Sequence, residues 1–135
     1  MRILLLGSSG FLGSHLKRKL LTKHKLIKNT GKNKYIIDLS QPKFIIEKLR
    51  LLRPDLIINT AVKVNFKLKS SKLLNTINYL SVKKIVKYCC NKKIRLIQVS
   101  GTGVHPLLKR YNKRSILKPK SFYLKTKLKA DQYIV

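Results

Sequence analysis

The sequence predicts an α/β fold, a doubly wound parallel sheet with helices on both faces in three layers. Short apolar runs alternate with segments that repeat leucine or isoleucine at helical spacing. Three glycines, Gly7, Gly10 and Gly13, separate the first apolar run from the first helical segment. At 135 residues and 44% hydrophobic, the chain has the size of one domain with a real core. Such alternation favours parallel strands joined by right-handed crossovers.

The expected elements follow from these patterns in chain order. The apolar runs predict five strands, at about residues 2–7, 25–28, 35–38, 56–59 and 94–100. The helical spacing predicts helices at about 11–22, 43–52 and 71–91, and a last helix that begins near Ser121. Arg53-Pro54-Asp55 ends the second of these helices, because proline cannot continue it.

The glycine cluster predicts a phosphate-binding turn. A helix N-terminus offers free N–H groups and a partial positive charge to a pyrophosphate. Side chains at Gly7, Gly10 and Gly13 would hold the phosphates away or push the helix off the sheet. The alternative is a glycine-rich turn that merely joins a strand to a helix.

Other polar segments are expected at the same edge of the sheet. Asp38, "NTAV" (59–62) and "SGTG" (100–103) each follow a predicted strand. Because ligands of such sheets bind beyond the carboxyl ends of the strands, these loops predict one shared site.

Tyr123 and Lys127 are four residues apart on the last predicted helix, which places both on one face. A free tyrosine has a pKa of about 10, and a nearby ammonium lowers it. The tyrosine could then exchange a proton with a carbonyl or hydroxyl during hydride transfer. In so lysine-rich a chain, the spacing can also arise by chance.

The charge balance is extreme, with 32 Lys and Arg against 4 acids and a net charge of +28. It predicts nonspecific binding of polyanions at low salt. A basic, non-catalytic nucleic-acid-binding protein on the same scaffold is therefore an alternative. However, the lysines are scattered along the chain without a basic tail.

Several classes are disfavoured. No stretch approaches the ~20 apolar residues of a membrane span, and we expect a cytoplasmic location without a membrane partner. Cys89 and Cys90 are the two cysteines, too few for a disulfide framework. His24 and His105 have no acidic cluster near them in sequence, so no metal site is expected.

The order of motifs resembles the extended short-chain dehydrogenase/reductase family, also described as NAD-dependent epimerases and dehydratases. The resemblance runs from Met1 to about Tyr133, and reductases of dTDP-activated keto-sugars look most similar. The matching motifs are "GSSGFLGSHL" (7–16), "DLSQP" (38–42), "RPDLIINTAV" (53–62), "NYLSV" (78–82), "QVSGTGV" (98–104) and "YLKTKLKADQ" (123–132). The resemblance implies a Rossmann-like fold and hydride transfer to or from a nucleotide-activated sugar. A sugar-nucleotide epimerase or dehydratase fragment is the alternative within the family.

The resemblance also implies a role for each matching residue. The cofactor pyrophosphate would lie against Gly7, Gly10 and Gly13, with Phe11 and Leu12 at the helix start. Asp38 and Leu39 would lie against the adenine. The riboses would lie beside Thr60, Ala61 and Val62, and Asn78 would belong to the active-site region. Tyr123 and Lys127 would be the catalytic pair and would also contact the cofactor.

Three departures from the family pattern are present. Gly101 stands where members carry a catalytic Ser or Thr, so Ser100 and Thr102 are the candidate substitutes. Leu124 replaces a glycine that commonly follows the catalytic tyrosine. Members also continue beyond the point matched by Val135 with the region that forms most of the sugar-nucleotide pocket. We therefore expect a NAD(P)-binding domain without that C-terminal region, a truncated or inactive form, or one completed by a separate chain.

The cofactor is expected to be NADP or NAD. An acid after the second strand would accept the ribose hydroxyls of NAD, but Lys28, Asn29, Thr30 and Lys32 are found there. A basic, polar loop favours the extra phosphate of NADP.

Overall fold

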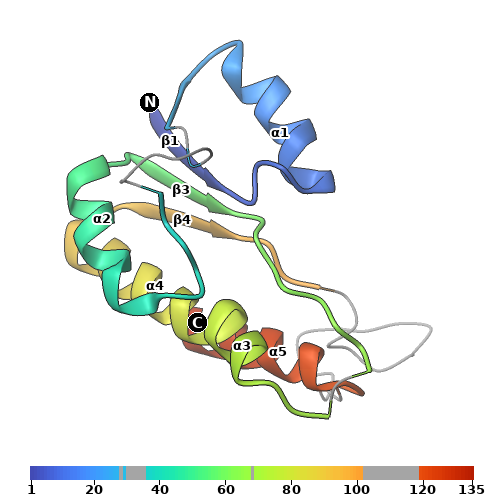
Figure 1. Ribbon diagram of the computed structural model, residues 1–135. Helices are drawn as coiled ribbons and strands as arrows, with labels where there is room; N and C mark the ends of the chain where they lie inside the picture. Colours follow the sequence, from blue (N-terminus) through green and yellow to red (C-terminus); the bar gives the residue numbers. More distant parts are fainter. Residues whose placement is uncertain (28, 30–35, 68, 102–118) are drawn as a thin grey trace.

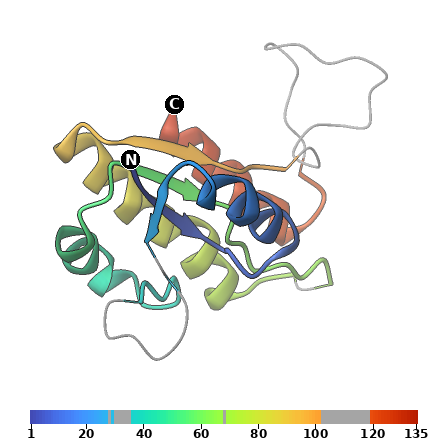
Figure 2. The ribbon, with the colours of Figure 1, turned by 90° about the horizontal axis from the view of Figure 1, so that it is seen from above.

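The computed structural model describes residues 1–27, 29, 36–67, 69–101 and 119–135. These residues contain a parallel sheet of four strands in the order β2-β1-β3-β4 (Figure 1). The strands are β1 (Arg2–Leu6), β2 (Lys25–Ile27), β3 (Leu56–Asn59) and β4 (Arg95–Gln98). From above, they run side by side in that order (Figure 2). The predicted α/β class is confirmed.

Both faces of the sheet are covered, which gives the predicted three layers. One face carries α1 (Phe11–Leu21), and the other carries α2 (Ile45–Leu52) and α4 (Ser81–Lys92) (Figure 1). A short 3-10 turn, η1 (Pro42–Phe44), leads into α2. The last helix, α5 (Phe122–Ile134), begins at Ser121, whose hydroxyl accepts the N–H of Leu124. None of the described helices is long and apolar enough to cross a bilayer.

Alternation along β1 divides the core in two. Leu4 and Leu6 face the cluster formed with α2 and α4, in which Leu49 and Ile85 are fully buried. Ile3 and Leu5 face the smaller cluster under α1. Successive residues of a strand point to opposite faces, so continuous burial requires cover on both sides.

The strand expected at 35–38 is wrong for residues 36–38, which are not part of the sheet. The side-chain amide of Asn29 replaces the neighbouring strand. It accepts the N–H of Ile37 at 2.7 Å and donates to the carbonyl of Ile37 at 3.3 Å. Ile37 is nevertheless 4% exposed and belongs to the larger core cluster. The apolar side chain of Ile37 is therefore buried as in a strand, but the Asn29 side chain, and not a neighbouring strand, forms the hydrogen bonds of the Ile37 backbone.

The helix expected at 71–91 is present but not uniform. It consists of α3 (Lys72–Asn75), a π-helical stretch η2 (Thr76–Leu80) and α4. Such π-helical turns are rare and occur often at functional sites. The stretch contains Asn78, which is 2% exposed.

Among the described residues, β4 is the edge strand at the other end of the sheet. Its residues are less buried than those of β3, and Ile97 remains 51% exposed. Ile97 pairs with Ile58, which belongs to the cluster under α1. The α1 layer therefore leaves this end of its face open.

Candidate functional site

A cavity of about 440 Å³ lies at the carboxyl ends of β1 and β3. From β1 the chain proceeds first to β2 on one side, and β3 then pairs with β1 on the other side. This is the topological switch point at which open α/β sheets bind ligands. The lining residues are Gly7, Ser9, Gly10, Phe11, Leu12, Gly13, Thr60, Ala61, Val62 and Val99. Eight of the residues predicted to contact a cofactor therefore line one cavity.

Gly7 is required by its own backbone and by β3. Its φ is +80°, a conformation that side chains disfavour. A Cβ at this position would also lie 2.6 Å from the backbone nitrogen of Ala61. No other residue type fits this turn without a shift of the backbone.

Gly13 and Gly10 differ in what they contact. A Cβ on Gly13 would lie 2.0 Å from the carbonyl oxygen of Gly7, so this glycine permits α1 to lie directly on the turn. A Cβ on Gly10 would be 3.4 Å from the same oxygen, and its φ of −74° suits any residue. Packing within the chain thus requires Gly7 and Gly13, whereas the space at Gly10 remains for a ligand.

The N-terminus of α1 is electrostatically suited to an anion. Gly10 is the N-cap and provides no side-chain bond to the first turn, which contains no acidic residue. The first N–H groups of a helix have no intrahelical partner and carry a partial positive charge. Phe11 is 87% exposed and Leu12 is 42% exposed beside them. These groups form the wall of the cavity that an anionic ligand would meet.

Thr60 fixes the β3 side of the cavity. Its hydroxyl donates to the carbonyl of Leu6 at 2.8 Å, which ties the end of β3 to the end of β1. Ala61 is held by the side chain of Asn59, which accepts the Ala61 N–H at 3.1 Å. The stretch from Thr60 to Val62 is therefore a fixed backbone wall.

Asp38 and Leu39 do not line this cavity. The Asp38 carboxylate accepts the hydroxyl and the N–H of Ser40 at 2.7 and 2.8 Å. These bonds, the hydroxyl first, hold the pKa of Asp38 below its ordinary value. Leu39 is 8% exposed, and its carbonyl accepts the hydroxyl of Ser81. Both residues stabilise the turn that leads into η1.

Asn78 connects three segments and has no hydrogen-bonding group left over in this arrangement. Its side-chain oxygen accepts the N–H of Lys63 at 2.9 Å. Its amide nitrogen donates to the carbonyl of Lys63 at 2.9 Å and to the hydroxyl of Thr126 at 3.1 Å. Thr126 in turn donates to the carbonyl of Tyr123 at 2.6 Å. Asn78 thereby positions the loop after β3 and the helix that carries Tyr123.

Tyr123 is half-buried at the start of α5, with its ring edge against Phe66 at a centroid distance of 5.2 Å. Burial raises the pKa of Tyr123 above its ordinary value. The expectation of a lowered pKa is therefore wrong for this arrangement, because the ammonium of Lys127 is directed elsewhere. At neutral pH the phenol is protonated.

Lys127 is 3% exposed, and its Nζ donates to the carbonyl of Val99 at 2.6 Å. Burial lowers the pKa of Lys127, and the carboxylate of Asp131 acts in the opposite direction. Val99 lines the cavity. The Lys127 ammonium is therefore bonded to the wall of the glycine-lined cavity, which neither Lys127 nor Tyr123 itself lines.

The substitutes considered for the hydroxyl missing at Gly101 are partly placed. The Ser100 hydroxyl donates to the carboxylate of Asp131. A Cβ on Gly101 would meet nothing within 4 Å. Thr102 lies outside the described residues, as do Lys28, Thr30, Lys32 and His105.

The structure adds three residues for which the sequence predicted no role: Val99 in the cavity wall, Phe66 against Tyr123, and Asp131 beside Ser100 and Lys127. Asp131 had a usable signal, because it is one of only four acids in the chain. It also lies one helical turn after Lys127. Val99 directly follows β4, so its place at the sheet edge could be expected from the strand pattern. Phe66 lies in the loop after β3, and no local pattern indicates its contact with Tyr123.

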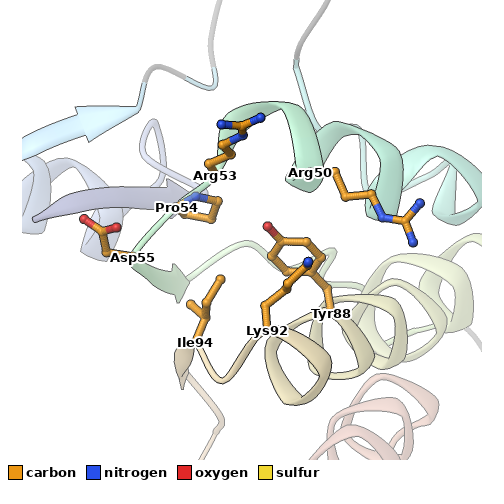
Figure 3. Close-up of a pocket in the computed structure, with 7 residues that line it drawn as sticks. All are labelled: Arg50, Arg53, Pro54, Asp55, Tyr88, Lys92 and Ile94. Carbon is orange, nitrogen blue, oxygen red and sulfur yellow. The ribbon is translucent and has the colours of Figure 1, made fainter.

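A second cavity, of about 560 Å³, lies at the opposite edge of the sheet (Figure 3). Arg50, Arg53 and Lys92 surround it at the ends of α2 and α4. Tyr88 forms part of its wall, and the Tyr88 hydroxyl donates to the carbonyl of Leu49 at 2.9 Å. Basic side chains at helix C-termini complement the dipole. This cavity contains none of the residues predicted to bind a ligand.

Within the described residues, no three His, Cys, Asp or Glu side chains come together as a metal site. The polar groups at the cavity are backbone N–H groups and the hydroxyls of Ser9 and Thr60, and the Lys127 ammonium is bonded to Val99 in its wall. This donor set suits a phosphorylated organic ligand better than a metal ion.

The sheet order and the glycine-lined cavity are those of a Rossmann-like α/β domain. The family described as RmlD substrate binding domain matches residues 1–135, and the chain belongs to it. A dTDP-4-dehydrorhamnose reductase from Salmonella typhimurium is 30% identical over 98% of the chain and 46% of its own length. The predicted family resemblance is confirmed.

Solved structures agree with this assignment. The crystal structure of a hypothetical dTDP-4-dehydrorhamnose reductase from Sulfolobus tokodaii has a TM-score of 0.86 and 27% identity, over 100% of this chain and 52% of that one. The Bacillus anthracis dTDP-4-dehydrorhamnose reductase in complex with NADP shares the fold, with a TM-score of 0.81 at 18% identity over 98% of this chain and 48% of that one. The chain therefore spans about half the length of the relatives it matches.

Gly13, at which packing leaves no room for a side chain, makes a testable contrast with Gly101. In a helix interior, alanine is normally more stable than glycine by about 1 kcal/mol of folding free energy. At Gly13 we expect the opposite sign, because the new methyl group would overlap the Gly7 carbonyl. Gly13→Ala should lower the free energy of unfolding by about 1–3 kcal/mol. Gly101→Ala, with open space around it, should stay within about 0.5 kcal/mol. Urea unfolding followed by circular dichroism measures both, and equal stability of the two variants would contradict the packing role.

Proposed function

We propose that residues 1–135 form the NAD(P)-binding domain of an oxidoreductase that reduces a nucleotide-activated keto-sugar, as dTDP-4-dehydrorhamnose reductases do. The observation that carries the proposal is the cavity at the switch point, with the open N-terminus of α1 and the free space at Gly10. Membership of the matching family supports the substrate class.

The residues around the cavity fit a dinucleotide. The N–H groups of Phe11 and Leu12 would hold the pyrophosphate at the start of α1. Thr60, Ala61 and Val62 would present their backbone to the riboses. The Lys127 ammonium, which contacts the cavity wall, has donors beyond the one that it gives to Val99. When bound, a nicotinamide cofactor would supply the hydride.

The acid for a reduction would be Tyr123. A keto oxygen that accepts a hydride on its carbon needs a proton, and a phenol with a raised pKa holds that proton at neutral pH. Phe66 covers one edge of the ring, and Asn78, through Thr126, fixes the first turn of α5. These contacts support a fixed direction for the proton.

NADP is proposed as the preferred form. A hollow of about 330 Å³ beside the glycine turn is lined by Ser8, Lys17 and Asn29 among other residues. An ammonium and a hydroxyl there suit a ribose phosphate. NAD remains the alternative, since the Asn29 amide is already engaged with Ile37.

A sugar-nucleotide epimerase or dehydratase would use the same cofactor half. A UDP-glucose 4-epimerase from Thermus thermophilus, in complex with NAD, has the same fold at 21% identity and a TM-score of 0.78. The matching family and its reductase relative favour the reductase. We further propose that most of the sugar pocket comes from a further region or a separate chain, because the relatives are about twice as long.

Dinucleotide binding is the direct test. We expect NADPH, and more weakly NADH, to bind the purified chain in a calorimetric titration with one site. Gly10→Val should weaken binding at least about tenfold, or about 1.4 kcal/mol. The chain itself has room at Gly10, whereas the phosphates would not. Cys90→Val, at an exposed position of α4 outside the cavity lining, is the control and should bind as the parent does. A folded parent protein that binds neither dinucleotide would refute the proposal.

Turnover should be very weak for residues 1–135 alone. Positioning of the substrate supplies much of the acceleration of an enzyme, and these residues offer no hydroxyl at Gly101. Reduction of dTDP-4-dehydrorhamnose, followed by NADPH absorbance, should fall far below the ordinary range of roughly 1–1000 per second. A rate within that range would contradict the incomplete pocket. If the rate then persisted in Tyr123→Phe, the phenol would not be the acid.

The net charge of +28 is proposed to attract polyanions without specificity. We expect duplex DNA to bind at 50 mM salt and to be released near 200 mM, as contacts to phosphates alone predict. Fluorescence anisotropy with two unrelated duplexes measures this. Binding that persists at physiological salt, or that distinguishes the duplexes, would instead favour a nucleic-acid-binding protein.

A further inference from the structure

Two neighbouring residues at the end of β4 are joined to two residues of α5 that lie one helical turn apart. Lys127 donates its Nζ to the carbonyl of Val99 at 2.6 Å. Ser100 donates its hydroxyl to the carboxylate of Asp131. Residues i and i+4 share one face of a helix, so Asp131 continues the row formed by Tyr123 and Lys127.

Asp131 is also the charged group that supports the buried ammonium. Burial lowers the pKa of Lys127, and Asp131 raises it. The elements packed against α5 are α3, η2 and α4, and none of the three contains an aspartate or glutamate. The charged side chain that α4 places against α5 is that of Lys83, whose Nζ lies 4.9 Å from the ring centroid of Tyr133.

Carboxylates are scarce in this chain, and the other three act elsewhere. Asp38 accepts hydrogen bonds within its own turn, and Asp55 accepts the N–H of Arg2 at 2.6 Å. Glu47 lies in the first turn of α2. The chain has 32 basic residues and 4 acids, so its composition alone does not predict an acid one helical turn from Lys127.

We propose that Asp131 is a positioning residue of this site: through Ser100 it fastens the segment after β4 to α5, and it places its carboxylate one helical turn from the buried Lys127 ammonium. It acts through these two residues and does not itself line the cavity. Its importance for the reaction rests on the proposed function, whereas its effect on Lys127 does not.

The same contact assigns a role to Ser100. A hydroxyl has one proton, and that of Ser100 is directed to Asp131. Toward a substrate, Ser100 can therefore offer lone pairs but not the donor that Gly101 lacks. Ser100 and Asp131 thus together hold the segment after β4 against α5. A hydrogen-bond donor to a substrate oxygen must come from another group.

The protonation state of Lys127 tests the proposal directly. Its pKa can be followed in the full chain through the ε-methylene signals in two-dimensional ¹H–¹³C NMR, assigned with Lys127→Arg. Asp131→Asn keeps the shape and removes the charge, so the pKa of Lys127 should fall. At a pH below both values of the pKa, each unit of decrease raises the uncharged fraction of Lys127 about tenfold, and by less as the pH approaches them. Asp131→Glu should restore the pKa toward that of the parent.

Two matched variants separate charge from general damage. Ser100→Ala removes the hydroxyl but leaves the carboxylate, and it should keep the pKa of Lys127 near the parent value. Asp55→Asn removes a carboxylate at the other edge of the sheet and should not change that pKa. An unchanged Lys127 pKa in folded Asp131→Asn would overturn the proposal. If Asp131→Asn does not fold, Asp131→Ser takes its place: a lower Lys127 pKa in that variant supports the proposal, and an unchanged one overturns it.

Dinucleotide affinity then links the residue to the site. We expect Asp131→Asn to lose NADPH affinity at a lower pH than the parent, because its uncharged lysine binds ribose hydroxyls and phosphate less well. If NADPH does not bind the parent while the pKa of Lys127 still falls in Asp131→Asn, the placement of Asp131 stands and the proposed function fails. Identical pH profiles of affinity for parent and variant would overturn the role of Asp131 in binding.

Discussion

The described structure depends on the close approach of α1 to the turn after β1. The first turn of the helix lies on the carbonyl of Gly7, so close that a Cβ on Gly13 would be 2.0 Å from its oxygen. The turn itself lies against Ala61 at the end of β3. Because a strand, a helix and a second strand meet at this one point, the N–H groups of α1 face the edge where β1 and β3 separate. The cavity is a consequence of this contact, and it disappears if the helix moves outward.

A second constraint acts on the far side of the cavity. Asn78 holds both backbone groups of Lys63 and the hydroxyl of Thr126, and it does so from a π-helical turn. A buried amide with unsatisfied groups costs free energy, so the three segments are arranged to satisfy it together. The loop after β3 and the start of α5 are thereby positioned relative to each other, and Phe66 meets Tyr123.

The sequence predicted the layers, the strand at 56–59 and the cavity-lining glycines, because burial on both faces and backbone freedom leave local patterns. It could not separate the three glycines, since the clash that distinguishes Gly13 from Gly10 involves an atom of another segment. The strand at 36–38 was wrong because Ile37 is buried as a strand residue would be, while Asn29 serves its backbone. The raised pKa of Tyr123 was missed for a related reason: spacing on a helix does not say where the Lys127 ammonium points.

The open end of the sheet has a consequence for how the protein behaves in solution. An edge strand presents unpaired peptide groups that can add a strand from another molecule, and such templating leads to aggregation. Here β4 combines that edge with the half-exposed side chain of Ile97. The exposed Arg95 on the same strand and the net charge of +28 oppose the approach of a second copy. Against association through this edge, the described residues thus offer repulsion between like charges, an interaction that dissolved salt weakens.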